Sequence, residues 1–139
     1  MTGAPYLVFV SHASTDTWVA SQIARSIRDA GGEVFLDTAN IEKGDAYDAE
    51  ILEALRRCVE LVVLMTPAAS DSKNVWMEIG AVWYANKRLI GILYGISAED
   101  VQADPRMPQG FKQLQLLDVN DTDLYLGEVA RRIRKEADS

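Results

Sequence analysis

The sequence predicts an α/β protein with a flavodoxin-like, doubly wound sheet of five parallel strands in the order 2-1-3-4-5 and helices on both faces. Short, continuous apolar runs alternate with amphipathic segments along the chain. Such runs are typical of parallel strands that are buried on both faces. Right-handed crossovers would then place the intervening helices on both sides of the sheet. The 139 residues suit a single domain, 1–139.

The first strand is predicted at residues 6–10, YLVFV, because this apolar run is too short for a helix and rich in β-formers. A helix over residues 16–30 follows, with Ser14 or Thr15 as the expected N-cap. Gly31 and Gly32 supply its C-terminal stop. The buried stripe of this helix is expected to consist of Trp18, Ile23 and Ile27.

The second strand is predicted at residues 33–37, EVFLD, and a loop separates it from a helix over 46–58. Cys58 is expected at a packed position in this helix, as a small buried hydrophobe. It is the one cysteine of the sequence, so an intrachain disulfide is excluded. The inward face of the helix is expected to contain Ile51, Leu52 and Leu55.

The second half of the chain repeats the alternation. LVVLMT is the third strand, ended by Pro67, and a helix beginning at Ser72 or Asn74 ends near Lys87. RLIGILYG is the fourth strand, and a proline-containing loop leads to a short fifth strand. The three strands are expected at residues 61–66, 88–95 and 114–119, and the last helix at residues 124–136.

Composition excludes several classes of function. The apolar fraction of 48% allows a proper core, and a net charge of −7 argues against a nucleic-acid partner. The basic run RRIRK at residues 131–135 is best interpreted as a solvated helix face. No apolar run approaches the ~20 residues that span a membrane, so a cytoplasmic protein is expected. One histidine and one cysteine cannot build a zinc site of the usual kind.

Several catalytic and nucleotide-binding motifs are also missing from the sequence. Neither GxGxxG nor GxxxxGK[ST] is present, which removes the dinucleotide fingerprint and the P-loop. A Ser/His/Asp triad would need His12 as the base, but the nearby Ser11 and Ser14 give it no obvious orienting geometry. A receiver domain would have an aspartate at the end of the third strand, where this sequence has LVVLMTP.

The remaining candidates lie where the strands end. Ligands bind doubly wound sheets at the carboxyl ends of the strands, near the switch point. Here that edge would hold SHAS after the first strand, TANIEKGD after the second and TPAASDSKN after the third.

Glu78 is the acid of interest, because it lies on the helix that follows the third strand. At about 100° per residue, it sits about 70° from the core-facing line of that helix. One interpretation is a border glutamate that pairs with Lys73 or Lys43. The other is a carboxylate in a cleft, which could stabilise an oxocarbenium-like centre, attack a sugar carbon or hold a ribose hydroxyl.

Four segments resemble, in order, the conserved boxes of the TIR domain, as found in bacterial TIR proteins of the NAD-consuming type. They are YLVFVSHASTD, FLDTANIEKGD, SDSKNVWMEIGAVW and QLLDVNDTDLYLGEVARRI, and together they cover nearly the whole chain. The resemblance implies an enzyme that cleaves the nicotinamide–ribose bond of NAD+, giving nicotinamide and ADP-ribose or a cyclic form, with no separate cofactor. It makes Glu78 the catalytic residue. It also implies that the substrate site is lined by Ser11, His12, Ala13, Asp37, Ile41, Lys43 and Asn74.

The sequence departs from the TIR pattern at two places. Asn74 stands where the family usually has a tryptophan, one turn before the glutamate, and Trp76 is expected on the far flank of the helix. The loop over residues 38–45 lacks the proline of animal and plant relatives, which argues against an adaptor-type docking loop.

The resemblance also implies self-association through TIR–TIR contacts and a role in antiphage signalling. A single domain would then act on a separate effector protein through its product. Two alternatives remain: a non-catalytic TIR interaction module, and a nucleoside deoxyribosyltransferase with a glutamate nucleophile on a similar sheet.

Overall fold

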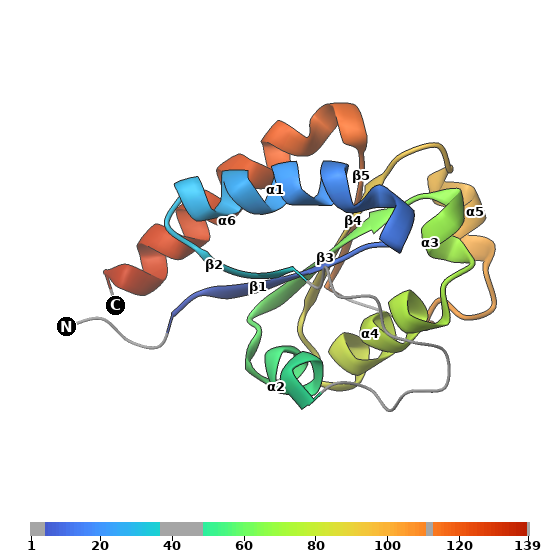
Figure 1. The fold of residues 1–139 in the computed structure, drawn as a ribbon, viewed down its shortest axis with the longest axis horizontal. Helices are drawn as coiled ribbons and strands as arrows, with labels where there is room; N and C mark the ends of the chain where they lie inside the picture. Colours follow the sequence, from blue (N-terminus) through green and yellow to red (C-terminus); the bar gives the residue numbers. More distant parts are fainter. Residues whose placement is uncertain (1–4, 37–48, 111–112, 139) are drawn as a thin grey trace.

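The predicted sheet is present in the computed structural model, which describes residues 5–36, 49–110 and 113–138. Five parallel strands lie in the order β2-β1-β3-β4-β5, as the sequence predicts. The central strand β3 is buried at all six positions. The strands, drawn in Figure 1, are β1 Leu7–Ser11, β2 Glu33–Leu36, β3 Glu60–Met65, β4 Arg88–Leu93 and β5 Leu114–Asp118.

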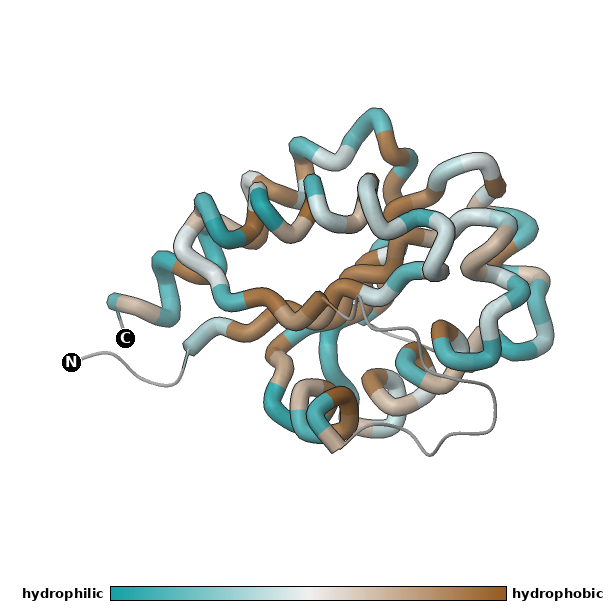
Figure 2. The backbone as a smooth tube through the Cα atoms, in the orientation of Figure 1, coloured by the Kyte–Doolittle hydropathy of each residue, from teal (hydrophilic) through white to brown (hydrophobic). Residues whose placement is uncertain are grey.

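Helices cover both faces of the sheet (Figure 1). α1 and α6 pack on one face, and α2 and α4 pack on the other. Figure 2 shows the result, with apolar strands in the middle of the molecule and polar stretches on the outer helices. The helices are α1 Thr17–Asp29, α2 Ala49–Arg57, α3 Pro67–Ser70, α4 Lys73–Tyr84, α5 Ala98–Ala103 and α6 Thr122–Ala137.

Alternating residues of each strand feed two separate cores, one on each face. In β1, Leu7 and Phe9 face α2 and α4, whereas Val8 and Val10 face α1 and α6. Phe9 stacks on Phe35 of β2, with ring centroids 5.1 Å apart. This double burial explains why the strands are continuous apolar runs in the sequence.

Two short helices lie in segments that were predicted as loops. α3 begins where Thr66 accepts a hydrogen bond from the backbone N–H of Ala69, and its first residue is Pro67. α5 begins at Ser97, whose hydroxyl accepts from the N–H of Asp100. Both are short, capped helices of four and six residues, too short for an apolar periodicity to be recognised in the sequence.

The predicted N-cap of α1 was wrong, although the helix begins within one residue of the predicted start. Residues Ser14–Asp16 form a 3-10 turn, and no side chain caps the helix that follows it. Thr17 instead donates to the carbonyl of Ser14 at 2.9 Å. Trp18 was also wrongly assigned to the core: it is 73% exposed, since it lies about 180° around the helix from Ile27.

The inward face of α2 was predicted in part. Ile51 and Leu55 are buried with Ala54, whereas Leu52 is 50% exposed. Cys58, just past the end of α2, is buried as expected, and burial raises the pKa of its thiol above the ordinary value.

A charged cluster lies inside the core at the amino end of β3. Glu60 is 0% exposed and accepts hydrogen bonds from the hydroxyls of Tyr6 and Tyr125 at 2.5 and 2.6 Å. Arg132 donates to both carboxylate oxygens at 2.9 and 3.0 Å. Burial alone would lower the pKa of Arg132, but its hydrogen bonds and ion pair with Glu60 outweigh burial and raise it. The cluster therefore joins β1, β3 and α6.

None of the described helices combines the length and the apolar character that crossing a membrane requires.

Candidate functional site

Ser11 ends β1 at the carboxyl edge of the sheet. It pairs in register with Val63 of β3, and its side chain is buried. Because β1 and β3 are parallel neighbours, the segments that follow them emerge at the same edge. The observed topology thus brings these segments to the same edge of the sheet, where the sequence predicts a site.

Glu78 reaches this edge from α4. The helix begins at the N-cap Ser72, whose hydroxyl accepts from the N–H of Val75. Glu78 is 5% exposed, so the prediction that it lies near the buried side is confirmed. Its Oε1 accepts a hydrogen bond of 2.5 Å from the hydroxyl of Ser11. The alternative of a border ion pair with Lys73 is not observed between these two described side chains.

The Ser11–Glu78 contact connects two of the sequence boxes directly. A carboxylate removed from bulk water is a strong electrostatic group, because the local dielectric constant is low. The hydroxyl of Ser11 fixes one of its oxygens. This arrangement can stabilise a developing positive charge or attack an electrophilic carbon.

Of the other predicted site residues, the structure describes His12, Ala13 and Asn74. The Nε2 atom of His12 lies 3.2 Å from the hydroxyl oxygen of Thr17, so the ring is directed toward the start of α1. Ala13 is buried directly before the 3-10 turn, and Asn74 is exposed in the first turn of α4. The predictions for Asp37, Ile41 and Lys43 fall outside the described residues.

A second polar contact at the same edge was not predicted. The hydroxyl of Thr66 donates to the carboxylate of Asp16 at 2.6 Å and also caps α3. This contact ties the segment after β1 to the segment after β3. Asp16 closes the first box in the sequence, but its partner could not be found there because fifty positions separate the two residues.

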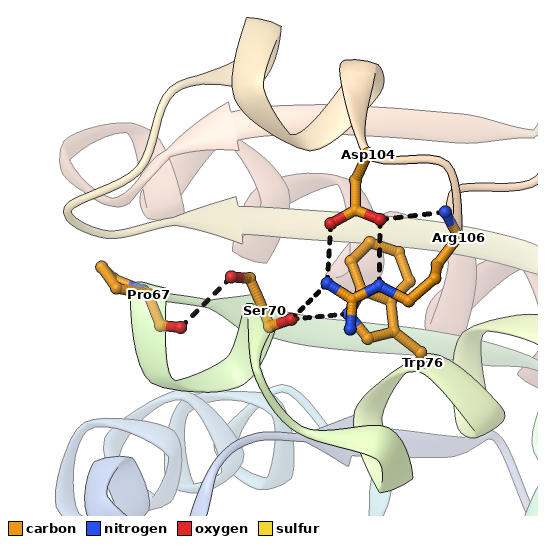
Figure 3. A network of polar contacts seen from close by, with 5 residues as sticks. All are labelled: Pro67, Ser70, Trp76, Asp104 and Arg106. Atoms are coloured by element: carbon orange, nitrogen blue, oxygen red, sulfur yellow. Dashed lines mark hydrogen bonds and ion pairs between the residues drawn. The ribbon is translucent and has the colours of Figure 1, made fainter.

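A third contact, drawn in Figure 3, braces α4 from the other flank. The indole N–H of Trp76 donates to the carbonyl of Ser70 at 2.9 Å, and the guanidinium of Arg106 lies 4.8 Å from the centre of the indole ring. Arg106 also donates to Ser70 at 2.7 Å and pairs with Asp104. The hydrogen bonds of Arg106 lower the pKa of the Asp104 carboxyl below its usual value.

This brace fixes the position of Trp76. Its ring is covered by Arg106, and at about 100° per residue Trp76 lies about 160° around α4 from Glu78. This agrees with the expectation that Trp76 lies on the far flank of the helix. Within the described parts of the chain, no group of three histidine, cysteine or acidic side chains is arranged to hold a metal ion.

The comparison with family models decides the classification. The model of the TIR domain matches residues 8–132, which is most of the chain. The chain belongs to the TIR domain family. The resemblance seen in the four sequence boxes is thereby confirmed at the level of the family.

Solved structures support the TIR fold. The TIR domain of the Toll-related receptor TRR-2 from Hydra magnipapillata is 20% identical, with a TM-score of 0.64 over 91% of this chain and 97% of that one. A TIR-STING receptor from C. gigas, solved with 2',3'-cGAMP, is 16% identical, with a TM-score of 0.62 over 88% of this chain and 39% of that one.

The TIR domains of the Roq1 resistosome, which recognises the pathogen effector XopQ, are 16% identical, with a TM-score of 0.61 over 96% of this chain and 84% of that one. At these identities the likeness concerns the fold. A comparison with curated protein sequences found no match.

Proposed function

We propose that this TIR domain cleaves the bond between nicotinamide and ribose in NAD+, with Glu78 as the catalytic carboxylate. The observation that carries the proposal is the hydrogen bond between Glu78 and Ser11. It holds a buried acid at the carboxyl edge of the sheet, where doubly wound folds bind their ligands. Glu78 also matches the glutamate that is catalytic in TIR enzymes.

The chemistry requires a group that stabilises positive charge at the sugar. When the C1'–N bond breaks, its electron pair leaves with nicotinamide, and the ribosyl centre becomes cationic. A carboxylate fixed beside that centre lowers the energy of the transition state. Water then attacks C1' and loses a proton to give ADP-ribose, or a nitrogen of the adenine ring attacks to give a cyclic product. NAD+ is thus the substrate, and no separate cofactor is needed.

Ser11 is a positioning residue in this mechanism. Its hydroxyl donates to Oε1 of Glu78 and so fixes the orientation of the carboxylate relative to the edge of the sheet. The Asp16–Thr66 contact and the Arg106–Trp76 brace hold the flanking segments in place. His12, Ala13 and Asn74 are proposed to line the substrate site, together with Asp37, Ile41 and Lys43.

The cellular role is part of the same proposal. We place the protein in the cytoplasm of a bacterium, where NAD+ is available, and assign it to antiphage signalling. Self-association through TIR–TIR contacts would complete the site, and a separate effector protein would respond to the product.

A second function is favoured by the outer surface of α4. Met77, Trp83 and Tyr84 are all exposed there, Tyr84 by 88%. Large apolar side chains on one exposed helix are typical of interaction surfaces. A TIR module that only assembles with other proteins would use such a surface and would leave Glu78 without a catalytic task.

Product analysis separates these functions. Concentrated wild-type protein, Glu78→Gln and the control Glu99→Gln are incubated with NAD+, and the products are separated by chromatography with mass detection. Glutamine keeps an oxygen that can accept from Ser11 but removes the charge, so the variant is expected to fold and to lose activity.

Release of nicotinamide by the wild type and the control, but not by Glu78→Gln, supports the proposal, and the mass of the co-product distinguishes hydrolysis from cyclisation. No release by an assembled wild-type protein favours the interaction module. Base exchange between deoxynucleosides would favour a deoxyribosyltransferase instead.

A further inference from the structure

A basic hollow lies at the amino edge of the sheet, opposite the edge that carries Glu78. Arg88 is the first residue of β4, and the last turns of α6 run back toward the end of the sheet where β1 begins (Figure 1). Two hollows of about 310 and 380 Å³ adjoin there. Both are lined by Arg88, Arg132 and Lys135, so they are neighbours, and we call the two together the amino-edge site.

Positive charge gathers in the amino-edge site against the overall charge of the chain. Besides Arg132, which is paired with Glu60, it is lined by four cations and two carboxylates. The whole chain has a net charge of −7. The cations are Lys87, Arg88, Arg131 and Lys135, and the carboxylates are Glu128 and Glu136.

Three of these cations have charges that no partner in the described structure neutralises. In the part of the chain that the structure describes, the side chains of Arg88, Arg131 and Lys135 make no hydrogen bond or ion pair. Lys87 differs, because its ammonium group donates to the carbonyls of Leu55 and Arg56 at 2.8 and 2.7 Å. Like charges brought together without partners repel one another, and a bound anion relieves this repulsion.

The floor of the site is rigid. Arg132 is held by two hydrogen bonds to Glu60 and one to the hydroxyl of Tyr6 at 3.2 Å. Because the guanidinium of Arg132 is already fixed, a ligand that binds beside it causes a smaller loss of side-chain entropy.

We propose that the amino-edge site binds a small phosphorylated ligand carrying two adjacent phosphate groups. Arginine presents paired N–H groups that match phosphate oxygens, and two such residues with a lysine complement a diphosphate. The volume lies at the lower end of the range for small-molecule sites. The site is separate from Glu78, so the inference does not depend on the proposed NAD+ cleavage.

The sequence alone pointed the other way, toward a solvated face for the run at residues 131–135. Basic residues that are neighbours on a helix often do no more than keep the protein soluble. The added observation is Arg88, more than forty positions earlier, which the fold brings to the same hollow as Arg131 and Lys135.

Titration calorimetry with inorganic pyrophosphate tests the proposal on the full chain at constant ionic strength. The variant Arg131→Gln/Lys135→Gln removes two ligand-facing charges, and Arg25→Gln/Arg28→Gln removes the same charge from α1, where neither residue lines the hollow. We expect the control to bind like the wild type and the first variant to bind at least about tenfold more weakly. The single variant Arg88→Gln, on a different element, is expected to weaken binding in the same direction.

Three results would overturn the proposal. They are no heat of binding with the wild type at millimolar pyrophosphate, an equal loss of affinity in both double variants, and binding of a single-stranded oligonucleotide without binding of pyrophosphate. Circular dichroism of each variant verifies that it is folded, and backbone amide shifts on titration locate the ligand at Arg88 and Arg131.

Discussion

Replacing Glu60 by glutamine tests the buried cluster at the amino end of β3. Each carboxylate oxygen now accepts from two donors: Oε1 from the Tyr6 hydroxyl and Arg132 Nε, and Oε2 from the Tyr125 hydroxyl and Arg132 Nη2. Glutamine has one oxygen and one NH2 group. In either orientation, the NH2 group faces two donors, and the charge of Arg132 loses its partner.

The size of the effect follows from these contacts. Removing one partner of a buried ion pair costs about 3–5 kcal/mol, and the lower end applies here because the Arg132 side chain that remains is 21% exposed. Glutamine retains one acceptor, so we expect the free energy of unfolding to fall by about 3 kcal/mol. For a chain of this length, that corresponds to a decrease of about 10 °C in the melting temperature.

Urea unfolding followed by tryptophan fluorescence and far-UV circular dichroism measures this loss. Glu99→Gln, at an exposed acid in α5, is the matched control and should change the unfolding free energy by less than about 1 kcal/mol. If Glu60→Gln is as stable as this control, the cluster contributes nothing to stability and the reasoning fails.

Three further predictions follow from the same contacts. Ser11→Ala removes the donor to Glu78, and we expect a decrease of about tenfold to a hundredfold in the rate of NAD+ cleavage and a loss of about 1–3 kcal/mol in the free energy of unfolding, because a buried acceptor loses a partner; an unchanged rate would contradict the positioning role. Arg106→Ala uncovers Trp76 and is expected to shift the fluorescence emission to the red and to lower the midpoint of urea unfolding, whereas an unchanged spectrum would refute the brace. Burial, and then Glu60, raise the pKa values of the two tyrosine hydroxyls at residues 6 and 125 above the ordinary value of 10.0, so the folded state keeps protons that the unfolded chain releases. The contribution is fully present below pH 10 and is lost as the pH rises further, so stability should fall above pH 10, and less steeply in Tyr125→Phe; equal slopes would count against it.

The fold could be predicted because its strands are short and buried on both faces. Val8 and Phe9 face opposite cores, so residues 7–10 of β1 are all apolar, and the pattern cannot be confused with an amphipathic strand. The buried faces of the helices were predicted less accurately than the strands. Trp18 was misplaced because large apolar residues attract a core assignment, although its angle around α1 excludes it from the buried stripe.

The contacts around the candidate site could be anticipated only in part. The sequence places Glu78 on the helix after the third strand and Ser11 at the end of the first, and the structure shows that these two side chains are hydrogen-bonded. The Asp16–Thr66 contact and the Arg106–Trp76 brace join segments that are distant in the sequence, and no local pattern marks them. Polar contacts between loops depend on tertiary geometry, which local spacing does not encode.

The Glu60 cluster also has a consequence for biosynthesis. Its hydrogen bonds join Tyr6 to Arg132, which lie 126 positions apart, so the cluster stays incomplete until nearly all of the described chain has been synthesised. An early nascent intermediate in which β1 and β3 have paired would bury the carboxylate of Glu60 before its cationic partner exists. That penalty disfavours premature closure of the sheet on the ribosome.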